Sequence, residues 1–222
     1  MKSFKIISII GAILFISGCA YTNQIAMAPK VERIEISKPI PLEVALLISE
    51  ESRSQIFKSS PPDYPYEWPG YFIEPYQLPL GEAFEKAALQ IFSQFFQKVD
   101  LIRTPEEAKK YQVILEPRLA DFSVHSDYYG FNDWVGYHGV VFIHCRTKVV
   151  GTLRNQGKTI WQKTIETPKV TQYPVLNQLL GTLVGEEASD SMVQALEDLA
   201  RNMVQESHGP PRPGRGWLEE IK

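Results

Sequence analysis

The sequence lacks the features that mark two large classes of protein. Lys and Arg total 23 against 26 Asp and Glu, the net charge is −3, and the cations form no basic stripe. Nucleic-acid binding depends on such a stripe, so we expect no nucleic-acid partner. The apolar run Ile6–Ile16 is too short to cross a bilayer, because a spanning helix needs about 20 apolar residues.

Motifs for catalysis are also absent. The chain contains no G-x-S-x-G nucleophile turn, no H-E-x-x-H zinc motif and no P-loop. Acidic pairs such as Glu116 with Asp121 arise by chance in a chain this acidic. The pair Glu186 and Glu187 suits the start of a helix, where the helix dipole favours carboxylates. The sequence therefore predicts a protein that is not an enzyme.

Histidine and cysteine are scarce and show no metal-ligand spacing. His125, His138 and His144 flank one predicted loop, and strands on either side of that loop can bring them together. Without a paired-cysteine or H-E-x-x-H pattern, however, we expect surface histidines and no metal. Cys145 lies in an apolar run typical of a small buried side chain, the alternatives being a reactive thiol or an intermolecular bridge.

The first twenty residues have the order of a secretory signal. Lys2 and Lys5 precede Ile6–Ile16, whose length is typical of the apolar part of a signal peptide. The following Ile16-Ser17-Gly18-Cys19 resembles the lipobox of bacterial lipoproteins, a branched apolar residue, two small residues and a cysteine. The resemblance implies that residues 1–18 are removed and that Cys19 carries diacylglycerol and an acyl chain such as palmitate. No other cofactor is expected.

The residue after the cysteine bears on location. In enterobacteria-like lipoproteins an aspartate there favours the inner membrane, so Ala20 implies the outer membrane, with the chain facing the periplasm. Two or more acyl chains make a stable anchor. We expect residues 19–30 to form a tether, and no disulfide between Cys145 and the lipidated Cys19.

Hydrophobic periodicity predicts a single α+β domain over residues 31–206. Apolar residues recur every three to four positions in two predicted helices and alternate or run together in the predicted strands. A two-layer sandwich, with a mixed or antiparallel sheet of four to five strands and both helices on one face, buries both apolar stripes. The predicted helices are Gly81–Val99 and Gly185–Gln205, with a turn at Pro105–Lys110 capped by Thr104, and the predicted strands are Val31–Lys38, Leu42–Ser49, Asp100–Arg103, Tyr111–Ser126, Val140–Leu153 and Thr159–Thr167.

Three further details follow from proline and glycine. Pro117 cannot donate to a ladder, so it should mark an edge or a bulge. Asn155 and Gly157 predict a hairpin turn between the last two strands. The tail over residues 207–222 is rich in proline and glycine and is predicted to be mobile.

Aromatic residues concentrate in two predicted loops, residues 59–80 and 127–139. Six prolines in the first loop exclude a regular helix or a central strand. Rings in exposed loops favour protein interfaces or sugar stacking, and packing over the sheet as a small core is the alternative. The candidate partner-binding residues are Tyr64, Tyr66, Trp68, Tyr71, Phe72, Tyr128, Tyr129, Phe131 and Trp134.

The chain resembles small periplasm-facing lipoproteins of Gram-negative bacteria in four features. These are the lipobox, the helix Gly81–Val99, the strand pair with its Gly157-Lys158-Thr159-Ile160-Trp161 turn, and the closing helix. Such families include the lipopolysaccharide-assembly plug lipoprotein, and the Pel-type polysaccharide-export lipoprotein has a similar element order. The resemblance implies a non-enzymatic subunit or accessory of an envelope assembly or export machine, with an envelope protein complex as partner. A stand-alone module that binds glycan, peptidoglycan or lipid is the alternative.

Overall fold

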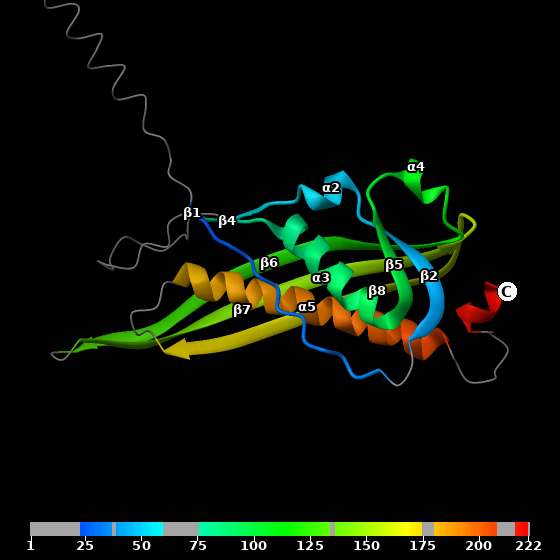
Figure 1. Ribbon diagram of the computed structural model, residues 1–222. Coiled ribbons are helices and arrows are strands. Elements are labelled where there is room, and N and C mark those ends of the chain that lie inside the picture. Colours follow the sequence, from blue (N-terminus) through cyan, green and yellow to red (C-terminus); the bar gives the residue numbers. More distant parts are fainter. Residues whose placement is uncertain are drawn as a thin grey trace, which may run out of the picture.

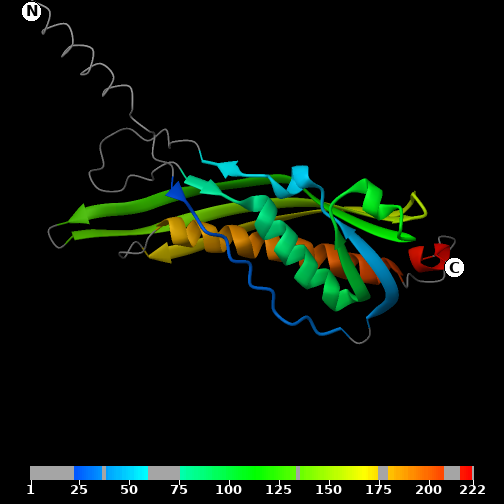
Figure 2. The ribbon, with the colours of Figure 1, turned by 45° about the horizontal axis from the view of Figure 1, so that its top comes forward.

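The computed structural model describes residues 23–36, 39–59, 76–133, 136–174, 180–207 and 216–221. These residues form an elongated body in which two long helices cover one face of a sheet (Figures 1 and 2). The strands are β1 (Asn23–Gln24), β2 (Ile40–Leu47), β3 (Phe57–Lys58), β4 (Tyr76–Leu78), β5 (Phe96–Ile102), β6 (Val113–Asp133), β7 (Gly136–Asn155) and β8 (Lys158–Pro174), and the helices are α2 (Glu50–Arg53), α3 (Leu80–Phe95), α4 (Pro105–Ala108), α5 (Leu180–Ser207) and the 3-10 helix η1 (Trp217–Glu220).

The main sheet has five strands in the order β5-β2-β6-β7-β8. β2 pairs in parallel with β5 and β6, whereas β6, β7 and β8 form consecutive antiparallel pairs. Parallel neighbours require a crossover connection, and the segment between β2 and β5 contains α3. The predicted two-layer α+β sandwich with a mixed sheet is confirmed. A second, three-stranded sheet of order β1-β4-β3 was not predicted.

The core lies between the sheet and the helices α3 and α5. α3 turns Phe84, Ile91 and Phe95 inward at helical spacing, and Leu199 and Met203 of α5 are fully buried. Burial of each such side chain stabilises the fold by about 1.5–3 kcal/mol. None of the helices in the described ranges has the length and apolar content needed to cross a bilayer.

The predicted helix Gly81–Val99 is too long at its carboxyl end. α3 ends at Phe95, and Phe96, with φ −112° and ψ 155°, already has extended backbone and begins β5. Val99 was included in the predicted helix because it lies four residues after Phe95, which is helical spacing. In the structure it belongs to β5, so the match to the helical period is a coincidence. The predicted capping of α4 by Thr104 is confirmed, since the Thr104 side chain accepts from the Glu107 N–H at 3.2 Å.

The predicted strand Val31–Lys38 is wrong for the residues that the structure describes. Residues 25–36, which we call the strap, follow β1 and run across α5 without pairing to the main sheet (Figure 1). Gln94 of α3 holds the strap at Ile34, whose N–H donates to Oε1 at 2.7 Å. Gly185 of α5 permits close approach, because a Cβ there would lie 2.7 Å from the carbonyl oxygen of Ala26. The predicted tether therefore packs on the domain from Asn23 onward.

The predicted loop over residues 127–139 is also wrong. β6 continues to Asp133 and β7 begins at Gly136, so most of this stretch is a hairpin. Tyr and Phe have high strand propensity, and here that propensity prevails over the loop signal of Gly130 and Gly136. Of the other predicted loop, residues 60–75 lie outside the described ranges, while Tyr76–Leu78 forms β4.

The turn between β7 and β8 is confirmed. Asn155 pairs with Lys158, and the two central residues, Gln156 and Gly157, have φ of 49° and 81°, as a two-residue hairpin turn requires. Pro117 was predicted to mark an edge or a bulge, and it lies at an edge. β2 pairs with β6 only as far as Leu115, so among the described residues the side of β6 that faces β2 has, at Pro117, no partner strand that would need an N–H donor.

The predicted mobile tail is wrong for residues 216–221. They form η1, in which Trp217 is buried against α5 and its indole N–H donates to the Met203 carbonyl oxygen at 2.9 Å. Asn155 also donates to the Glu220 carbonyl oxygen at 2.9 Å. Residues 208–215 and 222 lie outside the described ranges.

Candidate functional site

The face of the sheet opposite the helices is polar. Its outward side chains on β6, β7 and β8 form ion pairs across the strands, including Arg146 with Asp121 at 2.9 Å and with Glu166 at 3.6 Å. Glu116 pairs with Arg154 at 3.1 Å. Exposed pairs of this kind stabilise a fold by about 0–1 kcal/mol each. Glu116 and Asp121, noted above as a chance acidic pair, are therefore each the ion-pair partner of an arginine.

The far end of the β6–β7 hairpin extends beyond the rest of the sheet. β8 stops at Pro174, which pairs with Val140, so among the described residues the last four pairs of the hairpin, Gly130↔Gly139 to Asp133↔Gly136, have no third strand. We call residues 130–133 and 136–139 the ribbon. In both views it projects past the amino-terminal end of α5 (Figures 1 and 2).

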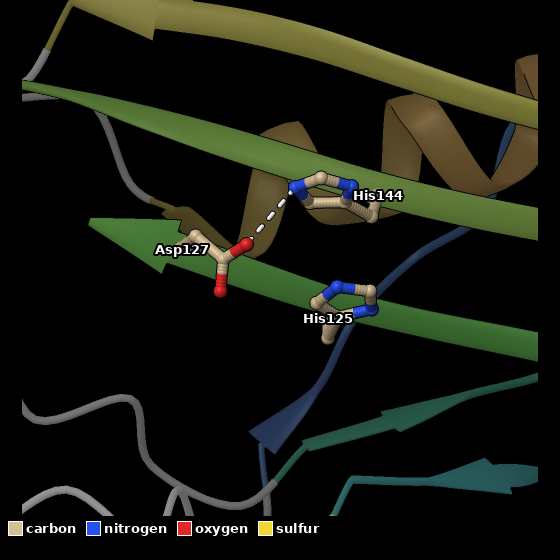
Figure 3. A group of neighbouring side chains, drawn as sticks. All are labelled: His125, Asp127 and His144. Atoms are coloured by element: carbon tan, nitrogen blue, oxygen red, sulfur yellow. Dashed lines mark ion pairs between the residues drawn. The ribbon is translucent and has the colours of Figure 1, made fainter. Parts of the chain in front are cut away.

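Near the base of the ribbon, three potential metal ligands meet on the open face. His125 of β6 lies directly opposite His144 of β7, and their rings stack with centroids 4.4 Å apart and an interplanar angle of 7°. Asp127, two residues after His125, places Oδ2 3.1 Å from His144 Nε2. Figure 3 shows the two rings one above the other with the carboxylate beside them.

The open-face cluster is accessible to solvent. The His125 side chain is exposed, and those of His144 and Asp127 are 32% and 38% exposed. His125 and His144 could be suspected from the sequence, but Asp127 was missed because residue 127 was predicted to lie in a loop. A usable signal was present, since His125 and Asp127 are two residues apart and alternate residues of a strand share one face.

A second polar cluster lies on the helix side of the sheet. Glu187 of α5 is 4% exposed, and Lys169, Thr171 and Tyr173, alternate residues of β8, all reach its carboxylate. Burial raises the pKa of Glu187, but the hydrogen bonds from Tyr173, Thr171 and Lys169 outweigh it and hold that pKa below its ordinary value. Burial, and after it the hydrogen bond to Glu187 and the charge of that carboxylate, raise the pKa of Tyr173. Because α5 begins at Leu180, the helix-start explanation of Glu187 is wrong.

The thiol of Cys145 is close to this second cluster. Cys145 is 3% exposed, and burial, with the Glu187 charge, raises its pKa to about 12. A thiol with such a pKa stays protonated at neutral pH and is a poor nucleophile. The prediction of a small buried side chain is confirmed.

A cleft of about 880 Å³ lies between the strap and α5. Its walls carry both signs of charge and contain no aromatic side chain. Burial raises the pKa of Glu197, one of its carboxylates, against the attraction of Arg201. The lining residues are Ala28, Lys30, Glu32, Arg33, Ile34, Glu35, Lys169, Glu186, Ser189, Asp190, Val193, Gln194, Glu197 and Arg201.

The structure gives only partial positions for the predicted site residues. Tyr128, Tyr129 and Phe131 lie on β6 at the base and in the first half of the ribbon. The remaining candidates and the lipid acceptor lie outside the described ranges, namely Cys19, Tyr64, Tyr66, Trp68, Tyr71, Phe72 and Trp134.

Comparison with known proteins finds remote likenesses. No family model matches the chain, and no curated protein matches its sequence. Similar solved structures include a Xanthomonas campestris protein that carries the DUF330 family model, with a TM-score of 0.42, 12% identity and coverage of 90% of this chain and 95% of that one.

Similar solved structures also include two other bacterial proteins. A minor lipoprotein from Acinetobacter baumannii has a TM-score of 0.34 and 11% identity, over 76% of this chain and 92% of that one. A Helicobacter pylori homolog of neuraminyllactose-binding hemagglutinin has a TM-score of 0.40 and 11% identity, over 85% of this chain and 96% of that one.

Proposed function

We propose that the protein is a lipid-anchored, non-enzymatic accessory subunit of an envelope assembly, held at the periplasmic face of the outer membrane by lipid on Cys19. In this proposal the ribbon docks onto a protein of that assembly. The projection of the ribbon beyond the sheet is the observation that carries the proposal.

The ribbon is a two-stranded extension of the sheet. A two-stranded hairpin is marginally stable in water without a third strand or a packed helix, and the described residues provide no third strand for the last four pairs. The sequence places Tyr129 and Phe131 at the start of this extension. Aromatic residues often carry much of the binding energy of protein interfaces, which suits an arm that completes its packing on a partner.

The position of the amino-terminal strand supports a partner at the membrane. Asn23 already lies in β1, only four residues after Cys19, and four extended residues span at most about 14 Å. β1 lies toward the same end of the body as the ribbon (Figures 1 and 2). A lipid on Cys19 therefore favours an orientation in which the ribbon end faces the membrane.

A double substitution in the hairpin tests this docking. We expect Tyr129→Ala with Phe131→Ala to abolish co-purification of a near-stoichiometric membrane partner when the full-length, lipidated chain is isolated from gently solubilised membranes. The midpoint of thermal unfolding should stay within a few degrees of the wild-type value, because the rings would pack on the partner and not in the core.

The matched control is Val170→Ser on β8, an exposed apolar residue (58%) outside the ribbon, which should retain the partner. A large fall in the thermal midpoint of the double variant would show that the rings belong to the core. A wild-type chain that purifies alone would count against an assembly role.

The cleft supports a second candidate, a binding module for a charged fragment of peptidoglycan. Its lining includes four basic and five acidic side chains, which suits a zwitterionic stem peptide better than a lipid tail. Lys30 and Arg33 come from the strap, and Asp190 and Arg201 from α5, so a ligand would contact both walls.

Calorimetric titration with a soluble disaccharide-peptide fragment tests this second function. Binding should weaken by about tenfold or more in Arg33→Ala and in Arg201→Ala, since a charged hydrogen bond is worth about 1.5–3 kcal/mol. Arg118→Ala, on the opposite face of the sheet, is the control and should bind as the wild type does. Absence of heat from the wild-type protein would eliminate the candidate.

A further inference from the structure

We propose that His125, Asp127 and His144 form a binding site for a divalent transition-metal ion, Zn²⁺ or Cu²⁺. The proposal does not depend on the docking function, because it uses only side chains on the open face of the described sheet. No metal was expected from the spacing of histidine and cysteine in the sequence.

The hairpin register brings the three ligands together. His125 and His144 are directly opposite across an antiparallel pair, and Asp127 follows His125 on the same face of β6. One ligand atom from each residue can be chosen so that all lie within 4.8 Å of one another, and one pair, His144 Nε2 with Asp127 Oδ2, is already at 3.1 Å.

A metal ion fits this spacing after a small side-chain rotation. Zn²⁺ bonds to imidazole nitrogen at about 2.0–2.1 Å, so tetrahedral ligand atoms lie about 3.4 Å apart. Asp127 and His144 are close to that separation, and the exposed His125 has room to turn its ring toward them. Because the β6–β7 ladder fixes the backbones of all three residues, the site needs no rearrangement of the sheet.

The donor set selects the class of metal. Two imidazole nitrogens suit Zn²⁺ and Cu²⁺, whereas Ca²⁺ and Mg²⁺ prefer oxygen ligands throughout. Three protein ligands leave a coordination position open, as in zinc sites that bind water or a further donor. The site lies on a solvent-facing surface, so that position is open to a ligand or to a side chain of a partner.

The nearest cation on this face of β7 does not compete for the carboxylate. Arg146, two residues after His144, pairs with Asp121 and Glu166. The Asp127 carboxylate therefore lies beside His144, where it can take part in binding the ion.

Metal titration of the full chain, purified in mild detergent and stripped with a chelator, tests the site. We expect saturable binding of one Zn²⁺ per chain by calorimetry, and nitrogen hyperfine structure in the electron paramagnetic resonance spectrum of the Cu²⁺ form. His125→Ala and His144→Ala should each weaken Zn²⁺ binding by at least about tenfold, and the double variant should lose both the binding and the nitrogen signature.

Two further variants make the result decisive. Asp127→Asn keeps the shape of the side chain, so it tests the charge of the ligand without a change in packing, and it should also weaken binding. His208→Ala removes a histidine from outside the cluster and should bind as the wild type does. Failure of the wild type to bind Zn²⁺, or unchanged binding in the double histidine variant, would overturn the proposal.

Discussion

Replacing Trp217 with alanine is expected to lower the free energy of unfolding by about 3–5 kcal/mol, the usual effect of deleting a buried aromatic side chain. Trp217 is 3% exposed, and its indole N–H donates to the Met203 carbonyl oxygen near the end of α5. The truncation removes both the packing and this hydrogen bond. Urea denaturation followed by circular dichroism measures the loss.

Leu218→Ala is the matched control for Trp217→Ala. Leu218 follows Trp217 in η1 but is only half-buried, so its truncation should have a clearly smaller effect. If Trp217→Ala were as stable as the wild type, η1 would not be docked in solution, and the prediction of a mobile segment would hold for residues 216–221.

The second large effect is expected at Glu187. Changing Glu187 to Gln keeps its size but removes the charge that Lys169 pairs with at 3.1 Å and that Thr171 and Tyr173 donate to. Breaking a buried ion pair costs about 3–5 kcal/mol, and the low end of that range applies here because Lys169 keeps its pair with Asp190 at 3.1 Å. We expect a loss of about 3 kcal/mol at pH 7, measured by urea denaturation.

The loss should depend on pH in a defined direction. The pKa of Glu187 is lower in the folded protein than its ordinary value of 4.5. The carboxylate therefore contributes its full stabilisation above that value and loses it as the pH falls through the folded pKa. The stability difference between the wild type and Glu187→Gln should shrink as the pH falls from 7 into this acidic range.

Glu186→Gln is the control for Glu187→Gln, because it removes a neighbouring negative charge that is not part of the second cluster. Glu186 is the neighbouring carboxylate on α5, and its side chain is exposed at the cleft. Surface substitutions usually change stability by no more than about 0.5 kcal/mol. Equal losses of unfolding free energy in the two variants would mean that the contacts between Glu187 and β8 do not stabilise the fold.

The elements that the sequence predicted well are those determined by local pattern. The stripe of α3, the Thr104 cap and the Gln156-Gly157 turn each depend on residues close together in the chain. The two-layer arrangement followed because two apolar stripes and several strands have few ways to be buried together.

The features that were missed depend on residues far apart in the chain. Trp217 is a single ring in a segment rich in proline and glycine, and only the place on α5 that receives it makes it a core residue. Lys169 and Tyr173 alternate visibly in sequence, but the position of Glu187 opposite them is set by how α5 lies on the sheet.

The candidate metal site was missed for a related reason. His125 and His144 could be suspected from the sequence, but their pairing follows from a hairpin register that extends through a stretch whose glycines indicated a loop. Once residue 127 belongs to a strand, Asp127 is placed beside them by the alternation of the strand alone.

The strap also determines how mechanical force would enter the molecule. It is the first long segment after the proposed lipid, and it crosses α5 instead of joining the main sheet (Figure 1). Tension between the membrane and a docked ribbon would therefore act on the β1–β4 pairing and the strap at one attachment point and on the β6–β7 hairpin at the other. Because the strap forms one wall of the cleft, a pull on the anchor that detached the strap from α5 would widen the cleft.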